Sequence, residues 1–173
     1  MITGNHILLR AVEETDLAQL LEWRNNPDLR KYFREFRELN HTMQLKWFNE
    51  RVNNDPSTRM FSIVEIKTNK LIGACGLCYI DWINKSADFS IYIGKDELYI
   101  DDVFSLDAAK LLIAYGFKEL NLHRLWSEIY DFDIKKKDFF NKLNFDIDGV
   151  FRESHWHDNK WNDSLIYSLL NKK

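Results

Sequence analysis

Apolar and polar positions divide the chain into short segments that alternate with period two and longer segments with helical spacing. Strands are predicted at residues 6–12, 61–66, 71–80, 87–94, 124–132, 145–156 and 160–170. Helices are predicted at residues 15–24, in a short segment opening at Pro27, at 42–54, from about 103 to 115, and at 134–143. Thr15 and Thr42 are the expected starts of the first and third helices, because threonine favours the N-cap.

The order of these elements predicts the fold class. One strand and three helices come first, three consecutive strands follow, and the later strands are separated by helices. Hairpins followed by helix-connected crossovers indicate a mixed sheet, here of about seven strands, with helices on both faces. We therefore expect an α/β (α+β) fold, and the length of 173 residues fits one domain over 1–173.

Composition narrows the classes of partner. Hydrophobic residues make up 45% of the chain and the formal net charge is -3, without the basic stripe of a nucleic-acid binder. Apolar runs stay well short of the roughly 18 residues that a membrane span needs. The first residues lack the layout of a signal peptide, so we expect a cytoplasmic protein with no nucleic-acid or membrane partner.

Two pairs of residues could suggest a metal or redox site. Cys75 and Cys78 have the spacing of a redox pair or half a metal site, but on a strand they point to opposite faces, which favours ordinary reduced thiols. His155 and His157 would share one face of a strand, yet no cysteine or carboxylate at ligand spacing joins them. We expect no metal.

Several phrases, in this order, carry a resemblance to a known family. They are LLEWRNNPDLRKYF, KLIGACGL, ADFSIYIG, FKELNLHRLWSEIYDFD, FFNKLNF and FRESHWHDNKWNDSLIYSLL. Together they cover essentially the whole chain, which resembles the GNAT family of acetyl-CoA-dependent N-acetyltransferases, in the branch of ribosomal-protein, polyamine and amino-sugar acetyltransferases. The resemblance implies acetyl-CoA as co-substrate and, as acceptor, a small amine such as an amino sugar or polyamine, or a protein N-terminus.

The resemblance also implies where acetyl-CoA binds. The strands ADFSIYIG and RLWSEIYDF would splay apart, so that pantetheine pairs with the backbone of Ile91, Tyr92 and Ile93. A backbone N–H near Ile93 would stabilise the oxyanion. The pyrophosphate would lie at the N-terminus of the next helix, where free N–H groups favour an anion. That contact would involve Asp102, Val103, Phe104 and Ser105.

The chain departs from the family pattern at this helix N-terminus, where the pyrophosphate is expected to bind. The two glycine positions fall on Val103 and Ser105, and Asp101 and Asp102 bring negative charge. Either the aspartates face solvent and the cofactor still binds, or one of them is an N-cap for the helix and the pocket has decayed. The second reading leads to an alternative function, a GNAT-like ligand- or partner-binding module without catalysis.

Two further cofactor-side positions differ from the family. Asp133 stands where an asparagine often contacts the cofactor, and Phe140 stands where a tyrosine often protonates the leaving thiolate. A water, Tyr130 or Tyr99 could supply that proton instead. The basic run 135–137 could meet the 3′-phosphate of the cofactor or form a solvated helix face.

The acceptor side offers carboxylates and one short segment. Asp88 and Glu128 are the candidates for deprotonating the amine, and an exposed strand acid is the alternative for Asp88. Trp23, Arg24 and Asn25 would border the acceptor cleft in the resembled branch, where Arg24 could hold an acidic or phosphorylated substrate, because a guanidinium suits bidentate contact. In the alternative the tryptophan packs in the core and the arginine pairs with a local acid. A homodimer is possible, with the aromatic residues of the last hairpin at its edge.

Overall fold

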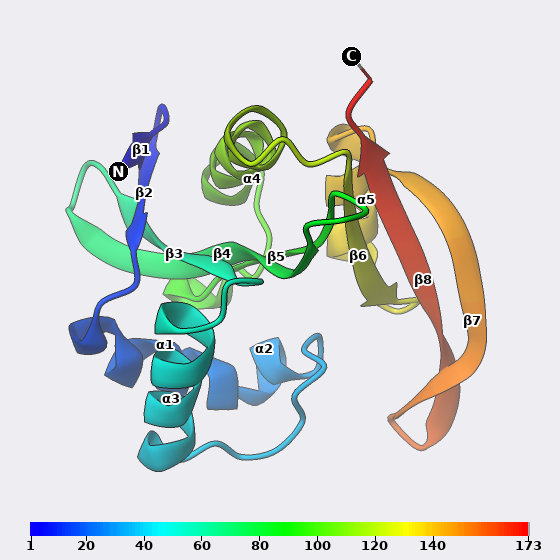
Figure 1. Ribbon diagram of the computed structural model, residues 1–173. Coiled ribbons are helices and arrows are strands. Elements are labelled where there is room, and N and C mark those ends of the chain that lie inside the picture. The colour runs from blue at the N-terminus through cyan, green and yellow to red at the C-terminus, as the bar shows by residue number, and fades with distance from the viewer. Residues whose placement is uncertain (173) are drawn as a thin grey trace.

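The structure, a computed structural model, describes residues 1–172 and contains one mixed sheet of eight strands (Figure 1). The strands are β1 (Ile2–Thr3), β2 (Ile7–Ala11), β3 (Arg59–Glu65), β4 (Lys70–Asp81), β5 (Ser86–Ile93), β6 (Arg124–Tyr130), β7 (Asp146–His157) and β8 (Lys160–Leu170). Their order in the sheet is β1-β2-β3-β4-β5-β6-β8-β7. The expectation of about seven strands was one short, because β1 is a two-residue strand that pairs with Leu8 and Leu9 of β2.

Within the described residues 1–172, five α-helices flank the sheet. They are α1 (Leu17–Asn25), α2 (Pro27–Arg30), α3 (His41–Trp47), α4 (Phe104–Ala114) and α5 (Ile134–Lys142). In Figure 1, α1, α2 and α3 lie on one side of the sheet and α4 on the other, which confirms the predicted mixed sheet with helices on both faces. Among residues 1–172, no helix is both long and apolar enough to cross a membrane.

The helix starts differ in part from the prediction. Helix α1 begins at Leu17, after a 3₁₀ turn in which Asp16 accepts the backbone N–H of Glu13 at 3.0 Å, so Thr15 is not the cap. Helix α3 is capped by Asn40, which accepts the N–H of Met43 at 2.9 Å, so Thr42 lies inside the helix. In both places a side chain with a carbonyl-type oxygen, rather than a threonine hydroxyl, satisfies a free N–H.

The core lies between the sheet and the helices on both of its faces. Its fully buried side chains include Leu20 from α1, Leu77 and Phe89 from neighbouring strands, and Leu112 from α4. Burying a side chain of this size stabilises a fold by about 1.5–3 kcal/mol. The core thus fixes β5 rigidly under the helices, and β5 is the strand from which the candidate site is built.

Candidate active site

Strands β5 and β6 run in parallel and separate after three residue pairs. Ser86, Ala87 and Asp88 pair with the first residues of β6, the last pair joining Asp88 to Trp126. β5 then continues to Ile93 and β6 to Tyr130. The backbone beyond Asp88 therefore borders an opening in the sheet, which is the splay that the resemblance predicted.

The side chain of Lys136 fills part of this opening. It comes from α5, is 8% exposed, and its Nζ donates to the carbonyl oxygen of Ile91 at 3.2 Å. The ammonium also lies 5.5 Å from the centroid of the Tyr99 ring. Burial lowers the pKa of Lys136, although the carboxylates of Asp133 and Asp88 act in the opposite direction. Of the basic run 135–137, this lysine points into the splay rather than to solvent.

Tyr99 closes the opening from the loop that joins β5 to α4. Its backbone exchanges two hydrogen bonds with Ile93, at 2.8 Å and 2.9 Å, and its hydroxyl donates to the carboxylate of Asp133. Its ring stacks on Tyr32 with centroids 4.1 Å apart. In this conformation the N–H of Ile93 donates to the carbonyl oxygen of Tyr99 and is not free to face an oxyanion.

Asp133 and Tyr99 are buried together. Asp133 is 2% exposed and begins α5, where it accepts the N–H of Lys136 at 3.1 Å. Burial raises the pKa of the Asp133 carboxyl, even though Lys136 lies beside it. The pKa of Tyr99 is raised well above its ordinary value by burial and by this carboxylate. The tyrosine therefore stays protonated and holds the loop against α5.

Asp101 occupies the N-terminus of α4. Its carboxylate accepts the backbone N–H groups of Val103, Phe104 and Ser105 at 3.0, 2.9 and 2.7 Å, and also the Ser105 hydroxyl at 2.7 Å. Burial works against this charge, but the hydrogen bonds from Ser105 and the amides outweigh it and lower the pKa of Asp101. Asp101 thus satisfies the first amides of α4 as the N-cap reading expected, although the N-cap residue itself is Val103. Asp102 is exposed and pairs with Lys142 at 2.6 Å.

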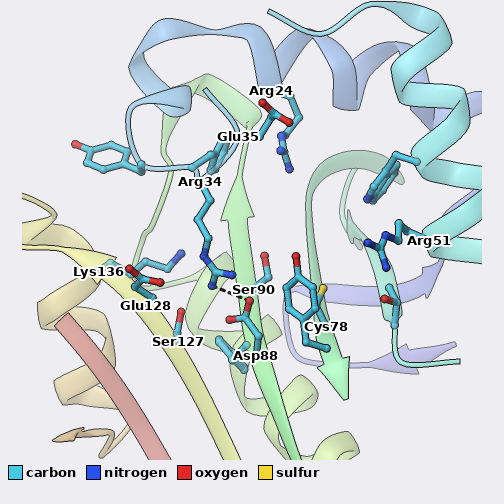
Figure 2. A pocket seen from close by; sticks show the side chains of 16 residues that line it. Arg24, Arg34, Glu35, Arg51, Cys78, Asp88, Ser90, Ser127, Glu128 and Lys136 are labelled. Atoms are coloured by element: carbon cyan, nitrogen blue, oxygen red, sulfur yellow. Dashed lines mark hydrogen bonds and ion pairs between the residues drawn. The ribbon is translucent and has the colours of Figure 1, made fainter. Parts of the chain in front are cut away.

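A cavity of about 330 Å³ opens beside β5 (Figure 2). Its charged lining residues are Arg24, Arg34, Glu35, Arg51, Asp88, Glu128 and Lys136. Figure 2 shows Arg34 reaching from the loop after α2 down to Asp88 on β5. Both carboxylates proposed for amine deprotonation therefore line one cavity, together with residues of the opening.

Asp88 is buried on the floor of this cavity. Its side chain accepts a hydrogen bond from Arg34 through Oδ2 at 2.7 Å, while Oδ1 is buried and has no partner. Burial raises the pKa of Asp88, against the influence of the Arg34 guanidinium. A carboxylate with one free oxygen and a raised pKa is suited to accept a proton. Asp88 is not the exposed strand acid of the alternative reading.

The three residues expected to border the acceptor cleft, 23–25, lie in different places in the structure. Arg24 lines the cavity, and its guanidinium carbon lies 4.9 Å from the centroid of the Phe33 ring. Trp23 packs in the core, where a Cβ on Gly94 would come within 2.0 Å of its ring. Asn25 bonds both backbone groups of Leu39 at 2.8 Å. Trp23 and Asn25 shape the wall from behind rather than line the cavity.

The remaining predicted cofactor residues lie in different surroundings. Tyr92 is buried edge-on to Trp23, with ring centroids 6.4 Å apart. Phe140 is fully buried and packs against Phe89 and Tyr167, so its ring lies in the core and not on the cofactor surface. Tyr130, a candidate acid, stacks on His155 with centroids 3.6 Å apart.

The two cysteines are free thiols in this fold. Cys75 is fully buried, and Cys78 lines the cavity. Burial raises the pKa of Cys75 and raises that of Cys78 to about 12. Neither thiol is ionised near neutral pH, so neither is a nucleophile there. Within residues 1–172, no cluster of three or more histidine, cysteine, aspartate or glutamate side chains is placed to hold a metal ion.

Comparison with known proteins agrees with this architecture. A family model described as an acetyltransferase (GNAT) domain matches residues 6–146. The chain is 26% identical over 165 residues to spermidine N(1)-acetyltransferase of Escherichia coli (strain K12), covering 95% of this chain and 86% of that protein. It is 25% identical over 169 residues to an uncharacterised N-acetyltransferase of Bacillus licheniformis, covering 96% and 94%.

A solved structure has the same fold. It is that of spermidine N-acetyltransferase from Vibrio cholerae in complex with CoA and spermine. It superimposes with a TM-score of 0.86 at 23% identity, covering 95% of each chain.

Proposed function

Since this chain belongs to the GNAT acetyltransferase family, we propose that the cavity beside Asp88 binds the amine that its reaction acetylates. The chain is an acetyl-CoA-dependent N-acetyltransferase, which moves an acetyl group from acetyl-CoA to an amine. The acceptor is a small molecule whose amine enters the cavity and approaches the opening between β5 and β6. The observation that carries this assignment is the buried, unpartnered Oδ1 of Asp88.

Asp88 accepts the proton that the amine must lose. The amine nitrogen bonds to the acetyl carbon as the carbon–sulfur bond breaks, one amine proton passes to Asp88 Oδ1, and the sulfur leaves as a thiolate. A positioned base typically contributes about 10²–10⁴-fold to such a step. Arg34 holds the other oxygen of Asp88 at 2.7 Å and so fixes the direction of Oδ1. Glu128 lines the same cavity and orients the amine from the β6 side.

The thioester end fits the edge of β5. Alternate residues of a strand direct their backbone groups to the same side. The N–H of Ile93 and the C=O of Ile91 both face the opening, because they bond Tyr99 and Lys136 there. The N–H of Ile91 therefore also faces the opening and is our candidate for stabilising the oxyanion. Acetyl-CoA supplies the activated acetyl group at this edge.

The diphosphate end does not fit this conformation. The three amides that would bind it are held by the Asp101 carboxylate, and Tyr99 lies across the opening. The loop between β5 and α4 must therefore move before acetyl-CoA binds. Asp96, Glu97 and Tyr99 in this loop have φ of 51°, 55° and 59°. Non-glycine residues in that left-handed region are held at a cost, which favours such a rearrangement.

The assignment is tested by turnover and by binding. The purified chain is incubated with acetyl-CoA and a panel of primary amines, and released thiol is measured for the native chain and for Asp88→Asn. We expect thiol release that depends on the amine and falls by about 10²-fold or more in the variant. Thiol release that is equal in the native chain and the variant would remove Asp88 from this role.

The Asp101 cap is the observation that favours the alternative, a binding module without catalysis. Calorimetry with acetyl-CoA separates the two functions, because an enzyme binds it and releases heat. A ligand at a hundredfold excess over its Kd also stabilises a fold by about 2.7 kcal/mol, which thermal unfolding detects. Absence of both signals would support the module.

Other partner assignments stay predictions. The absence of nucleic-acid, membrane and metal partners and a cytoplasmic location are expectations from the sequence, and a homodimer is one possible oligomer. A single domain over residues 1–173 is likewise a prediction. Gel filtration of the purified chain measures the oligomeric state directly.

A further inference from the structure

We propose that the acceptor carries an anionic group a few bonds from its amine, and that Arg24 binds this group. The inference rests on the proposed function and names the substrate class of the same site. Two buried atoms support it. Within residues 1–172, Arg24 Nε and Asp88 Oδ1 are the buried side-chain nitrogen and oxygen atoms without a hydrogen-bond partner.

These two atoms belong to residues that line one cavity. One is a cationic donor and the other is an anionic acceptor, and Figure 2 shows both side chains directed into the cavity from opposite walls. Buried polar groups without partners cost free energy, so a pair of them facing one space points to a ligand that satisfies both. A ligand with a donor at one end and an oxyanion at the other does so.

Among the described residues, Arg24 makes no ion pair of its own, although the Glu35 carboxylate is close enough to interact with its charge. Arg34 is paired with Asp88 at 2.7 Å, and Arg51 is paired with Asp55 at 3.0 Å. Glu35, the acid nearest to Arg24 in sequence on this wall, pairs with Arg37 at 2.6 Å. That pair, with a smaller contribution from the charge of Arg24, lowers the pKa of Glu35 to about 2. In the part of the chain that the structure describes, Arg24 itself forms no ion pair.

The position of Arg24 leaves space for an anion beside its guanidinium. Arg24, Glu35, Trp47 and Arg51 also line a second cavity of about 510 Å³ on the side of α3. Arg24 therefore stands at the junction of two cavities, with Arg51 on the same wall. A guanidinium suits two-point contact with a carboxylate or phosphate. The rest of an acceptor can extend from this junction toward α3.

A polycationic acceptor suits this wall less well. Spermine, the ligand named for the similar structure from Vibrio cholerae, is a chain of amines. Its far amines would meet Arg24 and Arg51, and like charges brought together in a partly buried site disfavour binding. The acids beside them, Glu35 and Glu50, are already paired with Arg37 and Lys46. Asp88 and Glu128 can accept one amine, but the guanidinium beyond them favours an oxyanion. We therefore assign the acceptor to amines that bear a carboxylate or a phosphate ester.

Matched pairs of amines test this assignment. Binding to the full chain is measured by calorimetry, without acetyl-CoA, for butylamine, 1,4-diaminobutane and 4-aminobutanoate, and for glucosamine and glucosamine 6-phosphate. We expect the anionic member to bind at least about tenfold more tightly than its neutral or cationic partner in at least one series. The two series distinguish a carboxylate from a phosphate as the anion. Tightest binding by the diamine, or equal binding throughout, would overturn the proposal.

Variants of Arg24 and of a control residue test where the anionic group binds. Arg24→Gln should remove the preference for the anionic amine, while Arg24→Lys should keep part of it because the charge remains. Arg152→Gln is the matched control, since Arg152 is exposed on β7 and lines neither cavity. A preference that survives Arg24→Gln in folded protein would contradict the role of Arg24. Thiol release with acetyl-CoA is scored separately, so that loss of transfer with intact selective binding would count against the proposed function and not against this inference.

Discussion

The carboxylate of Asp101 accepts the backbone N–H of Ser105 at 2.7 Å, at the turn where an anion would otherwise meet the first amides of α4. We predict that Asp101→Gly binds acetyl-CoA with a Kd about tenfold lower, because it frees three amides and removes one negative charge. The same change removes a helix cap and should lower the free energy of unfolding by about 1 kcal/mol. Calorimetry and chemical unfolding measure the two effects.

Asp102→Asn is the control for this prediction. Asp102 is exposed and pairs with Lys142 rather than with the amides. Its removal should change the Kd for acetyl-CoA far less. Equal tightening in both variants would show a general charge effect and would sink the specific role of Asp101.

Activity should rise with pH as Asp88 loses its proton. Burial raises the pKa of Asp88 above the ordinary value near 4, and only the carboxylate form can accept a proton from the amine. We expect kcat/KM of the native chain to fall as pH drops through this raised pKa. Asp88→Asn should remove that limb of the pH profile, while Glu128→Gln should retain it. A limb that persists in Asp88→Asn belongs to another group.

The buried Lys136 should make the free energy of unfolding depend on pH. Its lowered pKa means that the folded chain binds this proton less tightly than the unfolded chain does. The free energy of unfolding should therefore rise with pH between the lowered pKa and about 10.4. Lys136→Met should flatten this rise, as measured by thermal unfolding from neutral to alkaline pH.

Lys135→Met is the comparison for Lys136. Its ammonium is exposed and donates to the carbonyl of Leu98 at 3.3 Å. This variant should keep the native pH dependence. Identical slopes in the native chain and in Lys136→Met would mean that the lysine titrates normally.

Phe140→Tyr, which introduces the tyrosine that the family often has, should destabilise the protein without raising its activity. Phe140 is fully buried, with its ring centroid 4.8 Å from that of Phe145. A hydroxyl placed there without a partner should cost about 1–3 kcal/mol of stability and leave kcat unchanged or lower. Phe151→Tyr, at an exposed ring, should be nearly neutral. A rise in kcat for Phe140→Tyr would show that the ring reaches the leaving group.

The sequence predicted the parts of the site that depend on local pattern. The parallel pair β5 and β6 and its opening followed from element order and the family resemblance, while Asp88 facing the cavity was one of two readings left open for it. The cap by Asp101 was among the two readings of the loop, since an aspartate just before a helix often accepts its first amides. Each of these features is set within one or two neighbouring elements.

The missed residues depend on contacts between distant segments. Arg34 meets Asp88 across 54 positions of the chain. In the run 135–137, the sequence alone does not show which of the three lysines is buried, because tertiary packing determines that Lys136 points inward. Tyr99 reaches the opening because non-glycine residues of its loop adopt positive φ, which composition does not forecast. The two-residue strand β1 is too short for any periodicity.

The thiol of Cys78 on the cavity wall has a practical consequence for assays. With its pKa raised to about 12, it remains protonated at the pH values where disulfide reagents report free coenzyme. Cys75 is shielded altogether. We therefore expect a low blank when the released thiol is detected colorimetrically with the native chain.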